Sequence, residues 1–427
     1  MTLPIFGVPG GPDPKARGPV RERHDAYQAL RFPEYRWFLG GAMAVFVASQ
    51  MQSLVMGWQV YEITRDPLAL GFIGLAEALP FLGVTLVGGW AADHRDRRWL
   101  SLAAISVLFV GALTLVGMNL GAPPRAAWPF YAVQALAGLG RAFYRPASMA
   151  LGTELVPREA YQNAVTWRSS TFHLTSVLGP AFGGLLYGFG SARLAYGAEA
   201  LLMSVGLLAF LRLRPRPRPP GITGPLGRGL ALGLRFVFSQ KLILSAISLD
   251  LFAVLFGGAV ALLPAFAYDI LHLGPQGLGL MRAAPAAGSL LMSLALAHRR
   301  PSRRAGGTLL WCVAAFGLCW IAFAFSTSLA FSLLLLAASG AFDNVSVVLR
   351  STLVQTRTPP EMMGRVQAVN SFFIGSSNEL GAFESGLAAR VLGVVPSVVF
   401  GGGMTLVVVA VTAWLVPDLR KLKRISS

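Results

Sequence analysis

Five carboxylic acids stand inside stretches of sequence that are otherwise apolar. These acids are Glu77, Asp250, Asp343, Glu379 and Glu384. An unpaired ionised group at the centre of a lipid bilayer costs about 2.5 kcal/mol or more, so such residues are rare unless they serve a function. Removal from water raises the pKa of a carboxylic acid, which can then exchange protons near neutral pH. The pattern therefore indicates groups that bind protons or a polar ligand inside a membrane.

The same acids have a simpler interpretation, in which each forms a structural ion pair with an arginine of a neighbouring segment. Four arginines lie within or beside the apolar stretches and are suitable partners: Arg141, Arg145, Arg168 and Arg282. Gln50 lies in the first apolar stretch and is placed to line a cavity. Both interpretations lead to one set of candidate sites for protons or substrate, namely Glu77, Asp250, Asp343, Arg141 and Gln50.

The composition shows what kind of element must hold these groups. Only 13% of the 427 residues are charged, 54% are hydrophobic, and the mean hydropathy is +0.59. A soluble protein carries charge on about one residue in four. Apolar stretches of about 20 residues recur along the whole chain, and a helix needs this length to cross a bilayer. The expected fold class is therefore an all-α integral membrane protein with many spans.

Twelve apolar stretches are long enough to be transmembrane helices. They are Trp37–Tyr61, Leu68–Ala92, Leu100–Leu120, Trp128–Glu154, Asn163–Phe189, Arg193–Leu211, Leu242–Ala267, Gly277–Ala297, Thr308–Phe325, Leu329–Leu353, Val366–Val391 and Pro396–Leu415. An even number of spans returns the C-terminus to the side of the membrane from which the chain starts.

The net charge of +17 reflects membrane topology and not nucleic-acid binding. The basic residues stand in short connections between apolar stretches, so no long basic surface exists to follow a phosphate backbone. Lysine and arginine collect in the cytoplasmic connections of membrane proteins. Here they fill the connections after the even-numbered spans and both terminal tails. We therefore expect a multi-pass protein of the cell membrane with both termini in the cytoplasm.

The one long internal connection divides the twelve spans into two groups of six. Its first part alternates arginine and proline, which excludes a helix, and its later part, Leu226 to Phe238, is amphipathic. The expected organisation is an N-terminal tail (1–36), a six-helix half (37–211), a cytoplasmic linker with an amphipathic helix (212–241), a second six-helix half (242–415) and a C-terminal tail (416–427).

The two halves repeat each other at an offset of 202 residues. The matching pairs include Arg97 with Arg299, Arg98 with Arg300, Pro157 with Pro359, Gly179 with Gly381 and Gly184 with Gly386. The second span matches better at an offset of 205, where Pro80 meets Pro285. Each half has six spans, so the halves share one orientation and are related by an axis along the membrane normal.

The turn between the second and third spans joins an acid to several arginines. It resembles the Gly-x-x-x-Asp-(Arg)-x-(Gly)-Arg-Arg signature of the major facilitator superfamily, and the matching residues are Gly89, Asp93, Arg97 and Arg98. The resemblance implies a cytoplasmic latch that pairs across the interface between the halves. The simpler interpretation is a topology signal with helix capping. The copy in the second half keeps Arg299 and Arg300 but lacks the acid.

A second motif lies in the fifth span. It resembles the Gly-Pro-x-x-Gly-Gly motif of exporters, and the matching residues are Gly179, Pro180, Gly183 and Gly184. Small residues at this spacing let another helix pack closely. Residues 61–71, 155–159 and 359–370 resemble the bacterial branch of this superfamily that holds the enterobactin exporter and related drug exporters. One departure is Gln134, which stands where many drug–proton antiporters have arginine.

The resemblance implies a secondary transporter that exports an amphipathic small molecule, siderophore-like or drug-like, by alternating access. Its energy source would be the proton gradient, and no cofactor is expected. Neither a metal site nor an enzyme activity is expected, because the five histidines and two cysteines form no cluster. Import or facilitated passage of a small solute by the same fold is the alternative. We expect a monomer whose partners are the small molecule, protons and lipid, without nucleic acid.

Overall fold

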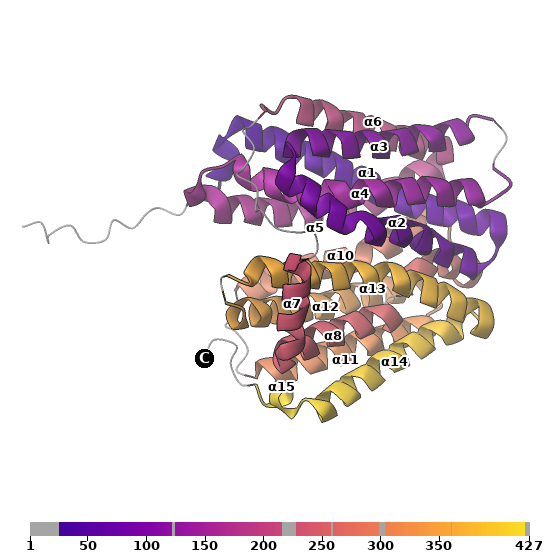
Figure 1. The fold of residues 1–427 in the computed structure, drawn as a ribbon. Helices are drawn as coiled ribbons and strands as arrows, with labels where there is room; N and C mark the ends of the chain where they lie inside the picture. The colour runs from indigo at the N-terminus through magenta and orange to yellow at the C-terminus, as the bar shows by residue number, and fades with distance from the viewer. Residues whose placement is uncertain are drawn as a thin grey trace, which may run out of the picture.

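The computed structural model describes residues 25–121, 124–215, 228–257, 259–298, 304–359 and 361–422. Every regular element in these ranges is a helix (Figure 1). The first six long helices are α1 (Pro33–Thr64), α2 (Pro67–His94), α3 (Arg97–Met118), α4 (Trp128–Glu154), α5 (Tyr161–Phe189) and α6 (Ala192–Leu211). The later ones are α7 (Arg228–Ser239), α8 (Lys241–Gly257), α9 (Leu263–Ala265), α10 (Pro275–Ala297), α11 (Ala305–Ala324), α12 (Leu329–Arg357), α13 (Met363–Leu392), α14 (Val394–Leu415) and α15 (Pro417–Lys421).

The long helices form two bundles that meet along one seam (Figure 1). Helices α1 to α6 make the first half, and α8 to α14 make the second. Across the seam, α5 packs against α10 and α2 packs against α13. The amphipathic helix α7 packs crosswise on α8 and α13. We call the end that carries α7, α15 and the α2–α3 turn the linker end, and the opposite end, with the α1–α2 turn, the far end.

Nine helical segments within the described ranges are long and apolar enough to cross a membrane. The three other predicted spans form α4, α5 and α13, which have 27, 29 and 30 residues and are therefore long enough. These helices are more polar than the nine apolar segments. For example, α4 holds Arg141 and Arg145, and α13 holds Glu379 and Glu384. Two of these polar helices, α5 and α13, form the seam. The seam therefore gives these two helices protein neighbours from the other half.

The seventh predicted span changes its helical geometry along its length. Helix α8 ends at Gly257, a 3₁₀ turn covers Ala259–Leu262 and a π turn covers Phe266–Ile270. Pro264 has no N–H to continue the hydrogen-bond ladder, so the change of geometry has a local cause. Because the π turn is wider than an α-turn, the segment ends with Asp269 turned towards α1, where it accepts a hydrogen bond from Tyr61.

The sequence repeat corresponds to equivalent contacts on the two sides of the seam. Gly184 of α5 lies against Gly279 of α10, and Gly386 of α13 lies against Gly71 of α2, so that an added methyl group would come within 2.9 Å of the opposite Cα. Equivalent residues of α2 and α10 are thus 208 positions apart, as are the prolines that begin both helices. The predicted offset of 205 is wrong by about one helical turn. The counterpart of Asp93 therefore falls at position 301, outside the described ranges.

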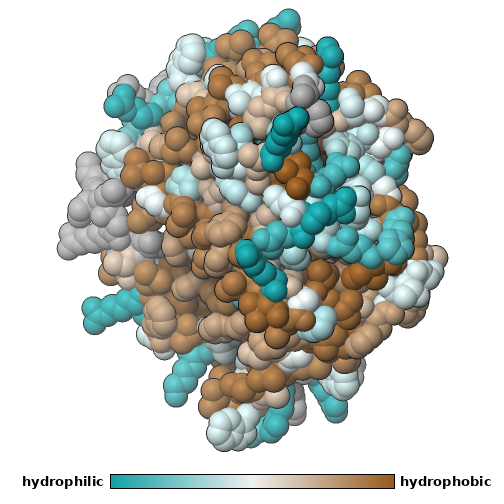
Figure 2. Space-filling view, turned by 90° about the vertical axis from the view of Figure 1, so that its right-hand side faces the viewer, coloured by the Kyte–Doolittle hydropathy of each residue, from teal (hydrophilic) through white to brown (hydrophobic). Residues whose placement is uncertain are grey.

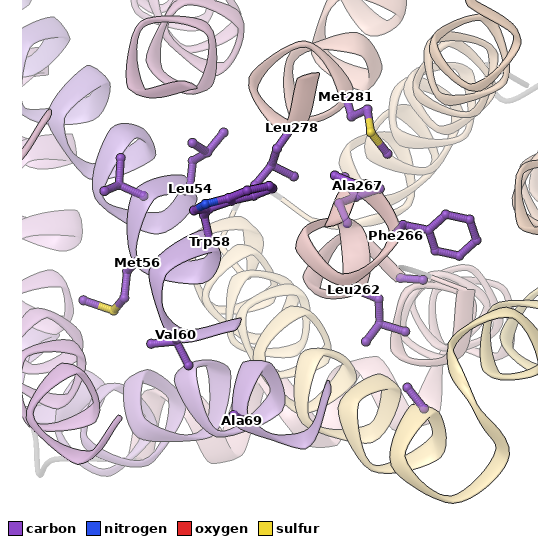
Figure 3. Packing of buried hydrophobic residues seen from close by; sticks show 14 of the residues in the cluster. Leu54, Met56, Trp58, Val60, Ala69, Leu262, Phe266, Ala267, Leu278 and Met281 are labelled. Carbon is purple, nitrogen blue, oxygen red and sulfur yellow. The ribbon is translucent and has the colours of Figure 1, made fainter. Parts of the chain in front are cut away.

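Buried apolar side chains close the seam towards the far end (Figure 3). Trp58 of α1 lies beside Leu278 of α10, and Leu54 and Met281 belong to the same cluster. The Trp58 ring also packs against Tyr268, with 5.4 Å between the ring centroids. Full burial of one large apolar side chain stabilises a fold by about 1.5–3 kcal/mol. This cluster therefore joins the two halves with a dry contact.

Candidate functional site

Glu77 lies in a buried polar site between α2 and α4. Gly138 of α4 leaves no room for a Cβ, because one would collide with the carbonyl oxygen of Glu77. Gln134 and Arg141 come four residues before and three after this glycine, so the helix places them on the same face. Gln134 Nε2 donates to Glu77 Oε2 at 2.5 Å, and Arg141 Nη1 forms an ion pair with Glu77 Oε1. Both carboxylate oxygens are satisfied although Glu77 is only 7% exposed.

The positive charge of this site comes from the middle of α4. Gln134 supplies only a neutral amide, whereas Arg141 supplies the cation two turns later. Arg145 lies one further turn along, is exposed, and holds its guanidinium carbon 5.3 Å from the centre of the Phe81 ring. The predicted pairing of Glu77 with a nearby arginine thus corresponds to Arg141.

The second half contains its own buried ion pair. Asp250 of α8 pairs with Arg350 of α12, and these residues are 8% and 3% exposed. Asp343, seven residues before Arg350 on α12, is half-buried and interacts electrostatically with both members of the pair. The sequence analysis selected both acids but not Arg350, although a lone arginine within the apolar run of α12 was a signal for it.

Charged groups of both halves gather near the middle of the seam. Glu379 of α13 lies against α2 at Gly74, with Oε2 3.7 Å from the position of an added Cβ. It interacts electrostatically with Glu77 and three arginines, Arg141, Arg145 and Arg282. Arg282 of α10 also donates to Ser53 Oγ of α1 at 2.8 Å, which directly joins the halves. The structure therefore brings Glu77 and Arg141 of the first half towards acid and base from the second.

The fifth-span motif packs α5 between two neighbours. Gly179 lies against Gln50 of α1, Gly183 lies against Met51, and Gly184 faces α10 across the seam. Gln50 is half-buried, so its aliphatic part packs on the motif. Pro180 is buried beside these glycines within the same helix. The motif thus provides close contacts inside the first half and between the halves.

Within the described part of the chain, the arginines of the signature turn at the linker end have partners in the first half. Arg97 pairs with Glu154 at the end of α4, and Arg98 donates to the carbonyl oxygens of Phe210 and Leu211 at 3.2 and 2.9 Å. A cation at these carbonyls also complements the negative end of the α6 dipole. Asp93 is exposed, and no described residue forms an ion pair or hydrogen bond with it.

The glycines of this turn differ in role. Gly88 faces α4, where an added Cβ would collide with the carbonyl oxygen of Ala142, whereas Gly89 faces open space. The close helix approach therefore depends on Gly88 and not on the signature residue Gly89. The predicted second copy, Arg299 and Arg300, lies outside the described residues.

The far end holds a set of contacts between the halves that the sequence analysis missed. Tyr61 donates to Asp269, Arg65 donates to Tyr268, and Arg390 pairs with Asp66 at 2.9 Å. Figure 2 looks onto this end and shows hydrophilic residues crossing a largely hydrophobic surface. Contacts between residues about 200 or more positions apart leave no periodic signal in one sequence, so only the three-dimensional packing reveals them.

Comparison with known proteins gives the family. The model of the Major Facilitator Superfamily matches residues 38–382. The chain belongs to the major facilitator superfamily. It is therefore a multi-pass membrane transporter and not an enzyme, and the family predicted from its motifs is confirmed.

Two relatives of this major facilitator protein are exporters by name. It is 28% identical over 381 residues to the multidrug efflux pump Tap of Mycolicibacterium fortuitum, which covers 86% of this chain and 91% of that protein. It is 27% identical over 388 residues to the enterobactin exporter EntS of Citrobacter koseri, with 90% of each chain covered.

Solved structures of other transporters share the fold. A bacterial homologue of the human lysosomal transporter Spinster, in an inward-facing and unoccupied conformation, matches with a TM-score of 0.69 and 15% identity over 91% of this chain and 98% of that one. The nucleoside transporter NupG matches with a TM-score of 0.69 and 12% identity over 91% of this chain and 98% of that one. These similarities support the two-bundle architecture.

One buried acid of this transporter was missed altogether. Glu199 lies in α6 and is 1% exposed. Its signal in the sequence was the same as that of Glu77, a single acid within an apolar run of twenty residues.

Proposed function

We propose that this transporter exports an amphipathic small molecule, of siderophore-like or drug-like chemistry, in exchange for protons. The names of Tap and EntS support the direction and the class of substrate. The observation that carries the coupling is the Glu77–Arg141 pair beside the seam. A single proton on Glu77 would remove the ion pair, and an acid inside a membrane-spanning helix is a suitable site for such a proton.

The proposed mechanism is alternating access by two six-helix halves of a twelve-span protein. Counting α4, α5 and α13 as spans is consistent with their length and with their polar residues at or near the seam. The arginines of the α2–α3 turn support a cytoplasmic linker end, and we extend this orientation to the two terminal tails. Protonation of the central acids from outside would favour one arrangement of the halves. Deprotonation inside, with substrate bound, would favour the other.

The test is transport in liposomes that contain only the purified chain. An imposed pH gradient should drive accumulation of the fluorescent amphiphile ethidium, and Glu77→Gln and Asp250→Asn should each abolish that accumulation. Glu159→Gln, an exposed acid at the linker end, is the matched control and should transport normally. Absence of gradient-driven transport by the unmodified chain would overturn the proposal, and so would full activity of both variants.

Stability must be separated from coupling in these variants. Removing one partner of a buried ion pair leaves an unpaired charge and costs about 3–5 kcal/mol. The double variant Glu77→Gln/Arg141→Gln removes both charges, so we expect it to recover much of the thermal stability lost by Glu77→Gln while remaining uncoupled. Ethidium retention by cells with and without the protein distinguishes export from the alternative, import.

A further inference from the structure

Glu199 differs from Glu77 and Asp250 because no described residue forms an ion pair with it. Neither carboxylate oxygen has a hydrogen-bond partner among the described residues, and Glu199 is 1% exposed. Its neighbours on α6 pack into two apolar clusters, with Tyr196 in one and Ala200 in the other. The hydroxyl of Tyr196, on the same helix, does not donate a hydrogen bond to Glu199. Tyr196 Oη donates its hydrogen to Gln59 Oε1 at 3.1 Å.

Among the described residues, one arginine is the charged neighbour of Glu199. Arg141 of α4 interacts electrostatically with Glu199, but its ion pair is with Glu77. The other titratable groups nearby are phenols, Tyr196 on α6 itself and Tyr187 on α5. The part of α3 that crosses the bundle, residues 99–118, has no ionisable residue, and the α1 group that reaches Tyr196 is the amide of Gln59. Arg141 thus interacts with three acids from different helices, Glu77, Glu199 and Glu379 of the second half.

An ionised carboxylate with neither a cation nor a hydrogen-bond donor is far less stable inside a bundle than its neutral form. We propose that Glu199 binds a proton in this arrangement of the halves and exchanges it through Arg141, as a second proton site of the transport cycle. When Glu77 takes up a proton, its ion pair with Arg141 ends. The charge of Arg141 then stabilises the ionised form of Glu199, so the neutral acid releases its proton. One proton is bound and one is released, so the charge around Arg141 stays constant.

This inference rests on the proposed proton coupling, but its first test needs no transport. The C=O stretch of a protonated carboxylic acid is visible by infrared spectroscopy of the purified chain at neutral pH. Subtraction of the Glu199→Gln spectrum should reveal one such band in the unmodified protein. In Glu77→Gln, which mimics protonated Glu77 and frees Arg141, the same subtraction against Glu77→Gln/Glu199→Gln should show that the band is lost.

The second test separates coupling from translocation in liposomes. Glutamine resembles a protonated glutamate, so Glu199→Gln should fold with the thermal stability of the unmodified chain. Exchange of ethidium across the membrane without a pH gradient should remain within about twofold, whereas gradient-driven accumulation should fall at least about tenfold. Ser204→Ala, on the same helix, is the control and should leave both rates unchanged, since Ser204 bonds only to the Ala200 carbonyl within α6.

Each outcome has a definite meaning. Absence of the Glu199 band in the unmodified protein would overturn the inference, because Glu199 would then be ionised. A band that persists in Glu77→Gln would overturn the exchange through Arg141. Full gradient-driven accumulation by Glu199→Gln would exclude it as a coupling site. Failure of the unmodified chain to respond to the gradient would instead count against the proposed function, while the infrared result would still decide the protonation of Glu199.

Discussion

The two ends of the transporter hold their charges in different ways. At the linker end, Arg97 and Arg98 are largely buried, and their partners among the described residues belong to the first half. At the far end, Arg65 and Asp269 are 46% and 45% exposed, and their contact crosses from one half to the other. Exposed pairs contribute about 0–1 kcal/mol each and are screened by salt, whereas buried hydrogen bonds to charged groups contribute more. The buried set is suited to holding one half rigid, and the exposed set is suited to being broken.

The largest expected effect comes from the buried set. Arg98→Ala removes two hydrogen bonds to the carbonyl oxygens that end α6, and hydrogen bonds of charged groups contribute about 1.5–3 kcal/mol. We therefore expect a clear drop in the midpoint of thermal unfolding in detergent. Arg95→Ala in the same turn is exposed and should unfold like the unmodified chain. Equal midpoints for the two variants would remove the distinction between the two ends.

A smaller effect is expected from the exposed set. Asp269→Asn and Asp66→Asn should each weaken the far-end contact by at most about 1 kcal/mol, which leaves unfolding nearly unchanged but shifts the balance between open and closed arrangements. Spin labels at Glu62→Cys and His272→Cys, in a Cys312→Ser/Cys319→Ser background, report the distance across the far end. The longer-distance fraction should grow in both variants and in high salt.

The matched control for this measurement is Asp418→Asn, an exposed acid of α15 at the linker end. It should leave the far-end distances as they are. If the distance distribution is unchanged in Asp66→Asn, in Asp269→Asn and in high salt, the apolar cluster around Trp58 alone keeps this end closed.

The smallest effect on stability is expected at Asp93. Because no described residue pairs with it in this arrangement, Asp93→Asn should change the free energy of unfolding by less than about 0.5 kcal/mol. Its proposed latch contact would form only when the linker end closes, so gradient-driven ethidium transport should nevertheless slow. Transport at the normal rate by this variant would show that Asp93 serves only as a topology signal.

The sequence predicted the helical architecture and several site residues because hydropathy and isolated acids are local signals. Glu77, Asp250 and Arg141 were selected for this reason, and the structure places each in a buried ion pair. Arg350 was not selected, because pairing depends on which helices pack together. The far-end contacts depend on the π turn at Phe266–Ile270, and periodicity alone does not show how such a turn directs side chains.

The sequence correctly predicted that glycines allow close helix packing, but it did not always predict which glycine does so. Close packing at Gly179 and Gly184 was predicted and is present. In the signature turn, however, Gly88 makes the close approach and not Gly89. Adjacent glycines point 100° apart on a helix, and the sequence does not show which one faces a neighbour.

Two glycine contacts across the seam are suited to act as pivot points for a rotation between the halves. They are Gly184 with Gly279 and Gly386 with Gly71. Both lie about one turn from the far-end start of α10 and α2, or about 6 Å along the helix, while about 35 Å of α2 extends towards the linker end. A rotation about the line through these points has unequal lever arms. Each ångström of separation at the far end would bring the halves together by about five to six at the linker end, so a small opening at one end corresponds to a large closure at the other.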